Sequence, residues 1–169
     1  MAISMFAASV PVLIRGLNNL AGILQKADAH VTDRKLKPEA LIEFRLYPDM
    51  LPLKNQVYIA TDNAKGCGAR LAGMIPPSYE DTEQTFPDLI ARVNKTIDFL
   101  KTLKSEQIDG SEENTVVLKF RTSERTFKGQ GYLLGYALPN FFFHVTTAYD
   151  ILRHNGVELG KSDYLGKAD

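Results

Sequence analysis

Apolar residues recur every three or four positions in four long segments of the chain, and this spacing places them on one face of an α-helix. The stripe in the first segment is Phe6, Val10, Leu13, Leu17, Leu20 and Leu24. The stripe in the second segment is Leu53, Val57, Ala60, Ala64, Cys67 and Leu71. Pro11 lies inside the first run, so we expect that helix to kink or to start near it.

The third and fourth segments show the same spacing. The third stripe is Leu89, Val93, Ile97 and Leu100. The fourth stripe is Leu134, Ala137, Phe141, His144, Ala148, Ile151 and Asn155. Pro139 falls within the fourth run, where it should kink the helix or mark its effective start. Four amphipathic helices therefore account for most of the chain.

Two stretches depart from the helical period. Residues 73–87 are rich in proline and polar side chains, which is typical of a loop. Residues 115–129 alternate apolar and polar side chains around a turn at 122–124, which predicts a short β-hairpin. The whole pattern predicts an all-α four-helix bundle, residues 1–169 as one domain, with the hairpin before the last helix. Leu159, Tyr164 and Leu165 could pack the tail back on the bundle.

Composition narrows the class of protein. Hydrophobic residues make up 44% of the chain and charged residues 24%, the balance of a globular protein. Lys+Arg and Asp+Glu number 20 each, so no basic excess predicts nucleic-acid binding. Cys67 is the one cysteine, which excludes an intrachain disulfide and fits a reducing cytoplasm. We expect neither a signal peptide nor a membrane span.

Aromatic residues off the fourth stripe suggest a surface for self-association. Phe142 or Phe143 must lie off that stripe because neighbours in a helix differ by about 100°. Tyr132, Leu133 and Tyr136 extend the same surface. Zero net charge offers no repulsion against contact, so we expect a homodimer. The alternative is that the hairpin and the tail cover these side chains within one chain.

His144 lies on the fourth stripe, so it should point into the bundle, where helix-borne ligand sites are built. A buried imidazole needs hydrogen-bond partners, and the ordinary interpretation is a satisfied core histidine. His154 and His30 should lie at helix ends without converging on it. The candidate pocket residues are His144, Asn140, Gln56, Asp62 and Tyr149.

Three stretches carry a resemblance to a known family: LPLKNQVYIATDNAKG (51–66), LPNFFFHVTTAYDILRHNGV (138–157) and LGKSDYLG (159–166). They resemble the DinB-like (DinB/YfiT) four-helix bundle superfamily, and most closely an uncharacterised subfamily within it, a domain of unknown function. Together with the first helix, the resemblance covers nearly the whole chain. The subfamily implies no assigned reaction.

The wider superfamily often has three metal-binding histidines, one on the second helix and an H-x-x-x-H pair on the last. His144 matches the second of that pair, Asn140 stands at the first, and residues 56–60 hold no histidine. We therefore expect no stoichiometric zinc or nickel, with a weakened site of His144 with Asp62 or Asp49 as the alternative.

Two functions remain open from the sequence. The first is a small-ligand binding or interaction protein with a degenerate metal site. The second, which the resemblance implies, is a metal-dependent transferase or hydrolase acting on a small substrate such as a thiol. The two missing histidines favour the first.

Overall fold

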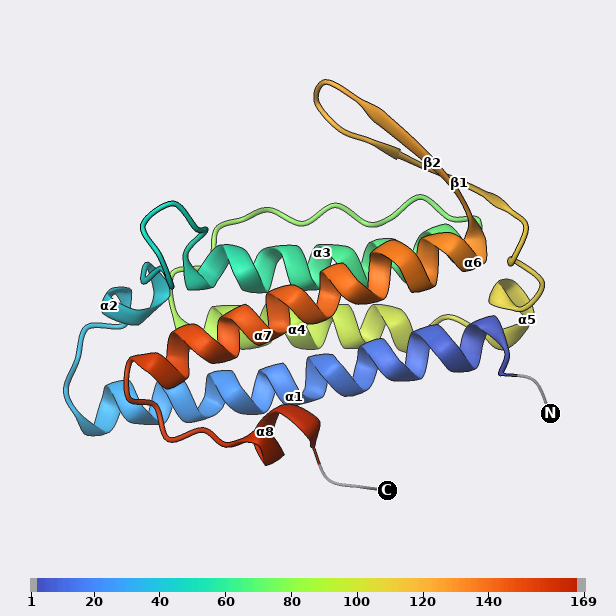
Figure 1. Cartoon of the computed structure of the whole chain (residues 1–169). Coiled ribbons are helices and arrows are strands. Elements are labelled where there is room, and N and C mark those ends of the chain that lie inside the picture. The colour runs from blue at the N-terminus through green and yellow to red at the C-terminus, as the bar shows by residue number, and fades with distance from the viewer. Residues whose placement is uncertain (1–2, 167–169) are drawn as a thin grey trace.

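Four long helices pack around one apolar core in the computed structural model, which describes residues 3–166 (Figure 1). They are α1 (Met5–Asp33), α3 (Leu53–Leu71), α4 (Phe86–Lys101) and α7 (Leu138–His154). Short helices join or flank them: α2 (Glu39–Ile42), α5 (Ser105–Ile108) and α8 (Lys161–Leu165). The predicted four-helix bundle is confirmed.

The predicted apolar stripes form the core. All six residues of the second stripe are at most 2% exposed, and the four of the third are at most 3% exposed. In the first stripe Phe6 is only partly buried, and α1 starts at Met5 and continues through Pro11. Burial raises the pKa of the Cys67 thiol to about 12, so this cysteine is a protonated core residue, as its position on the stripe predicted.

By length and composition, α1 alone among the described residues could cross a membrane. The core helix of a soluble protein passes the same test. Half of the most apolar part of α1 is buried within the bundle, against α4, α7 and α8. The apolar character of α1 is therefore explained by the bundle core.

The connection between α3 and α4 runs back along the length of α3, so these two helices point the same way (Figure 1). Arg92, buried on α4, anchors this connection. Its guanidinium donates to the Glu80 carbonyl oxygen at 3.0 Å and lies 2.9 Å from Asp81 Oδ1 and 3.2 Å from Glu83 Oε1. Those three residues lie in the connection, so a single buried cation fixes its path.

The same guanidinium also binds α3. Arg92 Nε donates to Thr61 Oγ1 at 2.9 Å, and Nη2 lies 3.0 Å from Asp62 Oδ1. The rings of Tyr58 and Tyr79 lie 4.5 and 5.4 Å from the guanidinium carbon. Arg92 thus joins α3, α4 and the connection through hydrogen bonds, ion pairs and cation–π contacts.

Replacing Arg92 with methionine, which keeps much of the buried stem and removes the charge, should lower the free energy of unfolding by about 2–4 kcal/mol. Urea denaturation measures this loss. Residues 73–85 should also become more sensitive to protease. The control is Lys101→Met on the exposed side of the same helix, expected within about 0.5 kcal/mol of the parent. Equal stabilities for the two variants would refute the anchoring role.

The hairpin forms as predicted, with β1 (Thr115–Lys119) and β2 (Glu124–Lys128) paired antiparallel. It projects from the end of the bundle where α3 ends and α7 begins (Figure 1). Val116 and Leu118 are its buried side chains, and the Phe127 ring packs 6.0 Å from the Tyr132 ring and 5.5 Å from that of Tyr136. The hairpin is therefore attached to the bundle through one face.

A π-helical turn precedes α7 and corrects the predicted fourth stripe. Helix α6 (Gly129–Tyr132) leads into the π turn η1 (Leu133–Ala137), and the Leu138 N–H donates to the Leu133 carbonyl, five residues back. The wider turn shifts the register, so Leu133 is buried and Leu134 is 54% exposed, the reverse of the prediction. Pro139 lies at the start of α7, as predicted.

Helix α8 returns the tail to α1. Asn19 Nδ2 donates to the Tyr164 carbonyl at 2.8 Å, and Lys26 Nζ lies 2.8 Å from Asp163 Oδ1. Leu159 is buried and Tyr164 is partly buried against the core, as predicted, whereas Leu165 is 50% exposed. The tail is therefore held by polar contacts together with two of the three residues from which its packing was predicted.

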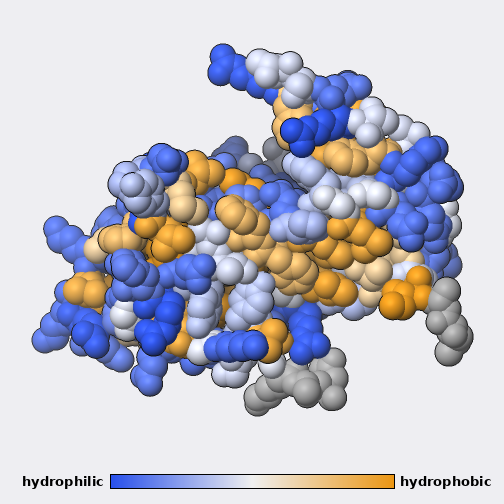
Figure 2. All heavy atoms as spheres, viewed as in Figure 1, coloured by the Kyte–Doolittle hydropathy of each residue, from blue (hydrophilic) through white to orange (hydrophobic). Residues whose placement is uncertain are grey.

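The surface expected to mediate self-association is smaller than predicted. Tyr132 and Leu133 are at most 1% exposed because the hairpin base and the π turn enclose them. Phe143, at 56%, and Leu134 remain exposed on the α7 side, where Figure 2 shows apolar residues gathered between the hairpin and the middle of the bundle. Tyr132 and Leu133, which were predicted to lie on this surface, thus belong to the core.

Candidate polar site between α3 and α7

Three polar residues of α3 are spaced seven apart: Gln56, Asn63 and Arg70. A heptad spacing keeps residues on nearly the same side of a helix, drifting only about 20° per repeat. This side faces the antiparallel segment of α6, η1 and α7. We call these residues and the facing side chains His144, Asn140 and Tyr132 the polar stripe. Each α3 residue and the side chain that faces it form one level: Gln56 with His144, Asn63 with Asn140, and Arg70 with Tyr132. The three levels differ in their hydrogen bonding.

At the first level His144 pairs with Gln56. His144 Nδ1 lies 2.7 Å from Gln56 Oε1, and Gln56 Nε2 donates to the Leu51 carbonyl at 2.8 Å. That carbonyl can only accept, so it fixes the amide orientation and turns Oε1 toward the ring. Nδ1 must therefore carry the proton, which leaves Nε2 with a lone pair in the neutral ring. The predicted burial and hydrogen bonding of His144 and the exposure of His154 are confirmed.

Burial lowers the pKa of His144, because a charged imidazolium loses hydration inside the bundle. The Phe143 ring packs edge-on against it at 5.2 Å. The amide oxygen of Gln56 is neutral and cannot offset a full charge. His144 is therefore a neutral residue at neutral pH.

The lowered pKa predicts a stability that depends on pH. Between the folded pKa of His144 and the unfolded value near 6.5, the unfolded chain binds more protons. The contribution of His144 is therefore complete above about pH 6.5 and is lost as pH falls through the folded pKa. Urea denaturation of the parent and His144→Gln between about pH 7.5 and about pH 5 should show their difference shrinking in acid. An NMR titration placing the pKa of His144 above 6.5 would contradict this account.

At the third level Arg70 pairs with Tyr132. Arg70 Nη1 donates to the Tyr132 hydroxyl oxygen at 3.3 Å. Gly66, one turn earlier, makes room for this arrangement, because a Cβ there would overlap Nη1. Desolvation raises the pKa of Tyr132 to about 12, so the phenol keeps its proton and can donate it. Among the described residues no carboxylate lies within ion-pair distance of Arg70.

The middle level holds Asn63 and Asn140 and is open. Asn63 is 9% exposed, and its Oδ1 is buried with no hydrogen-bond partner among the described residues. Both asparagines line a cleft of about 240 Å³ with Arg70, Tyr132 and Tyr136. Buried polar atoms in proteins are almost always paired, so the unpaired Asn63 Oδ1 is an exception that the contacts of the described residues do not explain.

The π turn shapes one wall of this cleft. Tyr132, Tyr136 and Asn140 follow one another at four-residue intervals through the widened helix, and all three line the cleft. The rings of Tyr132 and Tyr136 stack at 6.1 Å. Leu118 and Lys119 of the hairpin form another wall. Single π turns within helices are frequent at functional sites, and here the turn aligns polar side chains along the cleft.

The sequence placed five residues in a common pocket, and the structure brings together only part of that set. Gln56 bonds to His144, and Asp62 and Asn140 line the same cleft. The Asp62 carboxylate is occupied by ion pairs with Arg92 and, at 2.5 Å, with Lys65. Tyr149 packs instead against Tyr164 of α8, at 6.2 Å, and is not a partner of His144. Its place on α7, five residues after His144, turns it to another side of the helix.

His144, Asn140 and Gln56 do not form a donor set that suits zinc or nickel. His144 offers one imidazole nitrogen, Asn140 a neutral amide, and the α3 position opposite His144 holds Gln56, an amide already bonded to the ring. Zinc and nickel prefer imidazole and thiolate donors. Within residues 3–166 no three histidine, cysteine or acidic side chains are grouped for a metal. Asp49 is exposed in the connection before α3.

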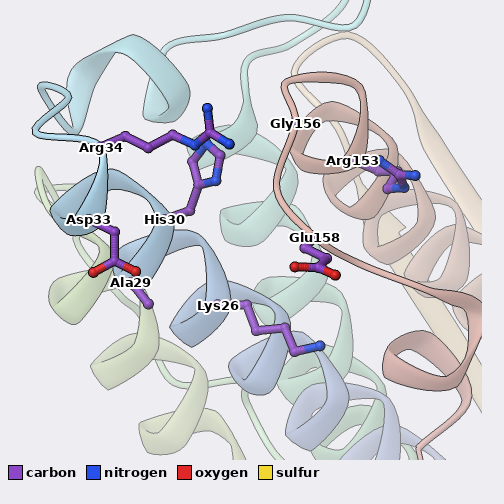
Figure 3. A pocket seen from close by; sticks show the side chains of 8 residues that line it. All are labelled: Lys26, Ala29, His30, Asp33, Arg34, Arg153, Gly156 and Glu158. Carbon is purple, nitrogen blue, oxygen red and sulfur yellow. The ribbon is translucent and has the colours of Figure 1, made fainter.

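A larger hollow of about 710 Å³ lies where α1 and α7 end, and none of the polar-stripe residues lines it (Figure 3). Lys26, His30 and Arg34 of α1 line it, with Arg153 and Glu158 from the end of the bundle. Lys26 is paired with Asp163. The hollow is a solvated surface of mixed charge, and it places His30 and His144 in separate parts of the molecule.

The fold is that of a DinB-like four-helix bundle. The family model described as "Domain of unknown function (DUF1993)" matches residues 5–165, and the chain belongs to this family. A crystal structure of a DinB family member protein from Shewanella denitrificans is 34% identical, and the match covers 96% of this chain and 92% of that chain with a TM-score of 0.87. No curated protein matches. The resemblance to the DinB-like superfamily is confirmed.

Asn63, Arg70 and Tyr132 were absent from the predicted pocket. The heptad spacing of Gln56, Asn63 and Arg70 beside the apolar stripe was a signal that could have found two of them. Tyr132 could not be placed this way, because its inward position depends on the π turn.

Proposed function

We propose that this protein binds a small molecule in the cleft between α3 and the α6–η1–α7 segment, where residues 118–120 at the turn end of β1 also line it. The observation that carries the proposal is the buried Asn63 Oδ1, which has no hydrogen-bond partner among the described residues; Asn63 lines the cleft with Arg70, a cation that has no acidic partner among them. Leaving such groups unpaired costs free energy, and a ligand that bonds to them recovers it. The cleft, at about 240 Å³, suits a ligand smaller than the drug-sized molecules of sites of roughly 300–1,000 Å³.

We further propose that the histidine positions of the wider superfamily form a degenerate metal site here. Asn140 and Gln56 supply amide groups that can orient an organic ligand but bind zinc or nickel poorly. A metal-dependent transferase or hydrolase would need donors that the described residues do not bring together. A cytoplasmic location accords with one buried, protonated thiol.

Filling the cleft tests binding. In fragment screening by NMR with the ¹⁵N-labelled full chain, binders should shift the backbone amides of Ile59, Asn63, Tyr136 and Asn140 together. Asn140→Trp places an indole in the cleft and should abolish these shifts, whereas Arg153→Trp, exposed near the end of the same helix, should preserve them. Fragments that bind elsewhere, or bind Asn140→Trp equally well, would contradict the proposal.

Self-association through the α7 side is a second proposal, with another copy of this chain as the partner. Phe143, Leu134 and Phe120 are each more than 40% exposed, and the chain has no net charge to oppose contact. Exposed apolar residues that a single bundle leaves uncovered are commonly buried in a two-fold interface.

Sedimentation equilibrium at micromolar concentrations should give a mass near twice the 18.8 kDa of one chain. Leu134→Lys should reduce this mass toward one chain, because burying a lysine in an apolar contact is unfavourable. Leu36→Lys, at a 42% exposed position beyond the end of α1, is the control and should leave the mass unchanged. A mass of one chain at every concentration would refute the proposal.

A further inference from the structure

We propose that the ligand of this cleft is a small organic carboxylate, bound by Arg70 and Tyr132 and contacted along its length by Asn63. This inference rests on the proposed function of the cleft and names the chemistry of its ligand. It follows from the charges at the cleft, from the free donors there and from the unpaired amide.

The charges around the cleft favour an anion. Arg70 and Lys119 line it from α3 and β1, and neither has an acidic partner within ion-pair distance among the described residues. Asp62 is the acidic residue of the lining, and its carboxylate lies 2.5 Å from Lys65 Nζ and 3.0 Å from Arg92 Nη2. Asp62 is therefore ion-paired, whereas Arg70 and Lys119 are cations of the lining without an acidic partner among the described residues.

The donor geometry at Arg70 fits a carboxylate. The guanidinium uses Nη1 to donate to the Tyr132 hydroxyl oxygen, and its other N–H groups have no partner among the described residues. A planar guanidinium matches the two oxygens of a carboxylate. The Tyr132 hydroxyl accepts from Arg70, so its own proton is free to donate to the same anion. A charged donor and a neutral donor thus converge on one position.

The middle level supplies the remaining contact. Asn63 lies seven residues before Arg70 on the same side of α3, and its amide can present either an acceptor or a donor by turning about its terminal bond. A ligand with an amide or hydroxyl group a few atoms from its carboxylate would pair with Asn63 while the carboxylate meets Arg70. The cleft volume corresponds to about eight water molecules, so a ligand held within the cleft can occupy no more than that volume.

A phosphate is the competing anion, and the structure favours it less. Phosphate sites usually collect several backbone N–H groups at a helix N-terminus or several cations. Arg70 is in the last turn of α3, where carbonyl groups rather than N–H groups are free. One guanidinium, one phenol and one lysine are better matched to a single negative charge.

The test uses three probes of matched size and the ¹⁵N-labelled full chain. N-acetylglycine carries a carboxylate and an amide, N-acetylglycinamide replaces the carboxylate by a neutral amide, and inorganic phosphate tests the competing anion. N-acetylglycine should shift the Arg70 Nε–H and Asn63 side-chain resonances and bind about tenfold more tightly than N-acetylglycinamide. Arg70→Gln should remove this preference, and Arg153→Gln should keep it.

A second variant guards against misfolding of the first. Tyr132→Phe removes one hydroxyl from a buried ring. It should weaken the binding of N-acetylglycine by about fivefold and change the binding of N-acetylglycinamide little. Equal binding of N-acetylglycine and N-acetylglycinamide in the cleft would overturn the carboxylate assignment and leave the proposed function standing. Tighter binding of phosphate at Arg70 would also overturn it. If no probe or fragment binds in the cleft, both the assignment and the proposed function fail.

Discussion

Polar side chains buried between two packed helices must find hydrogen-bond partners, and this constraint governs the contact between α3 and α7. His144 and Gln56 satisfy each other at one level, and Arg70 and Tyr132 do so in part at another. Between them the Asn63 amide stays unpaired beside a cleft. A bundle that only needed stability could have filled these positions with apolar residues, and the proposed ligand site takes its chemistry from the polar stripe.

Arg92 is subject to the same constraint, but its buried guanidinium is paired on all sides rather than left open. It is the most deeply buried cation of the described residues, and its donors are distributed over Thr61, three acidic side chains and the Glu80 carbonyl. This network holds the long connection against α3 and α4 and leaves no donor directed at the cleft. It also occupies Asp62, which would otherwise place an uncompensated negative charge beside Arg70. The Arg92 network and the cleft are therefore linked through the carboxylate of Asp62.

The helical period predicted the bundle because its core is regular: the residues of α3 and α4 on the apolar stripes are buried as their spacing requires. The same period failed at Leu134, since a π turn adds a residue that no local propensity reveals, and it failed for Tyr149, whose neighbour is α8 rather than His144. Residue type and helix position were sufficient to name both His144 and Gln56 as pocket residues from the sequence. The Arg92 network was not, because its partners lie in a loop whose path is fixed only by the folded structure.

The account depends on the middle of the polar stripe being a place for a ligand. A crystal structure of the protein purified from cell extract without added ligand, at a resolution that shows ordered water and small molecules, tests this directly. The account predicts non-protein density in the cleft in contact with the Asn63 amide and the Arg70 guanidinium. A cleft closed by the hairpin, with the Asn63 side chain hydrogen-bonded to the protein itself and Arg70 paired with an acidic residue, would contradict it.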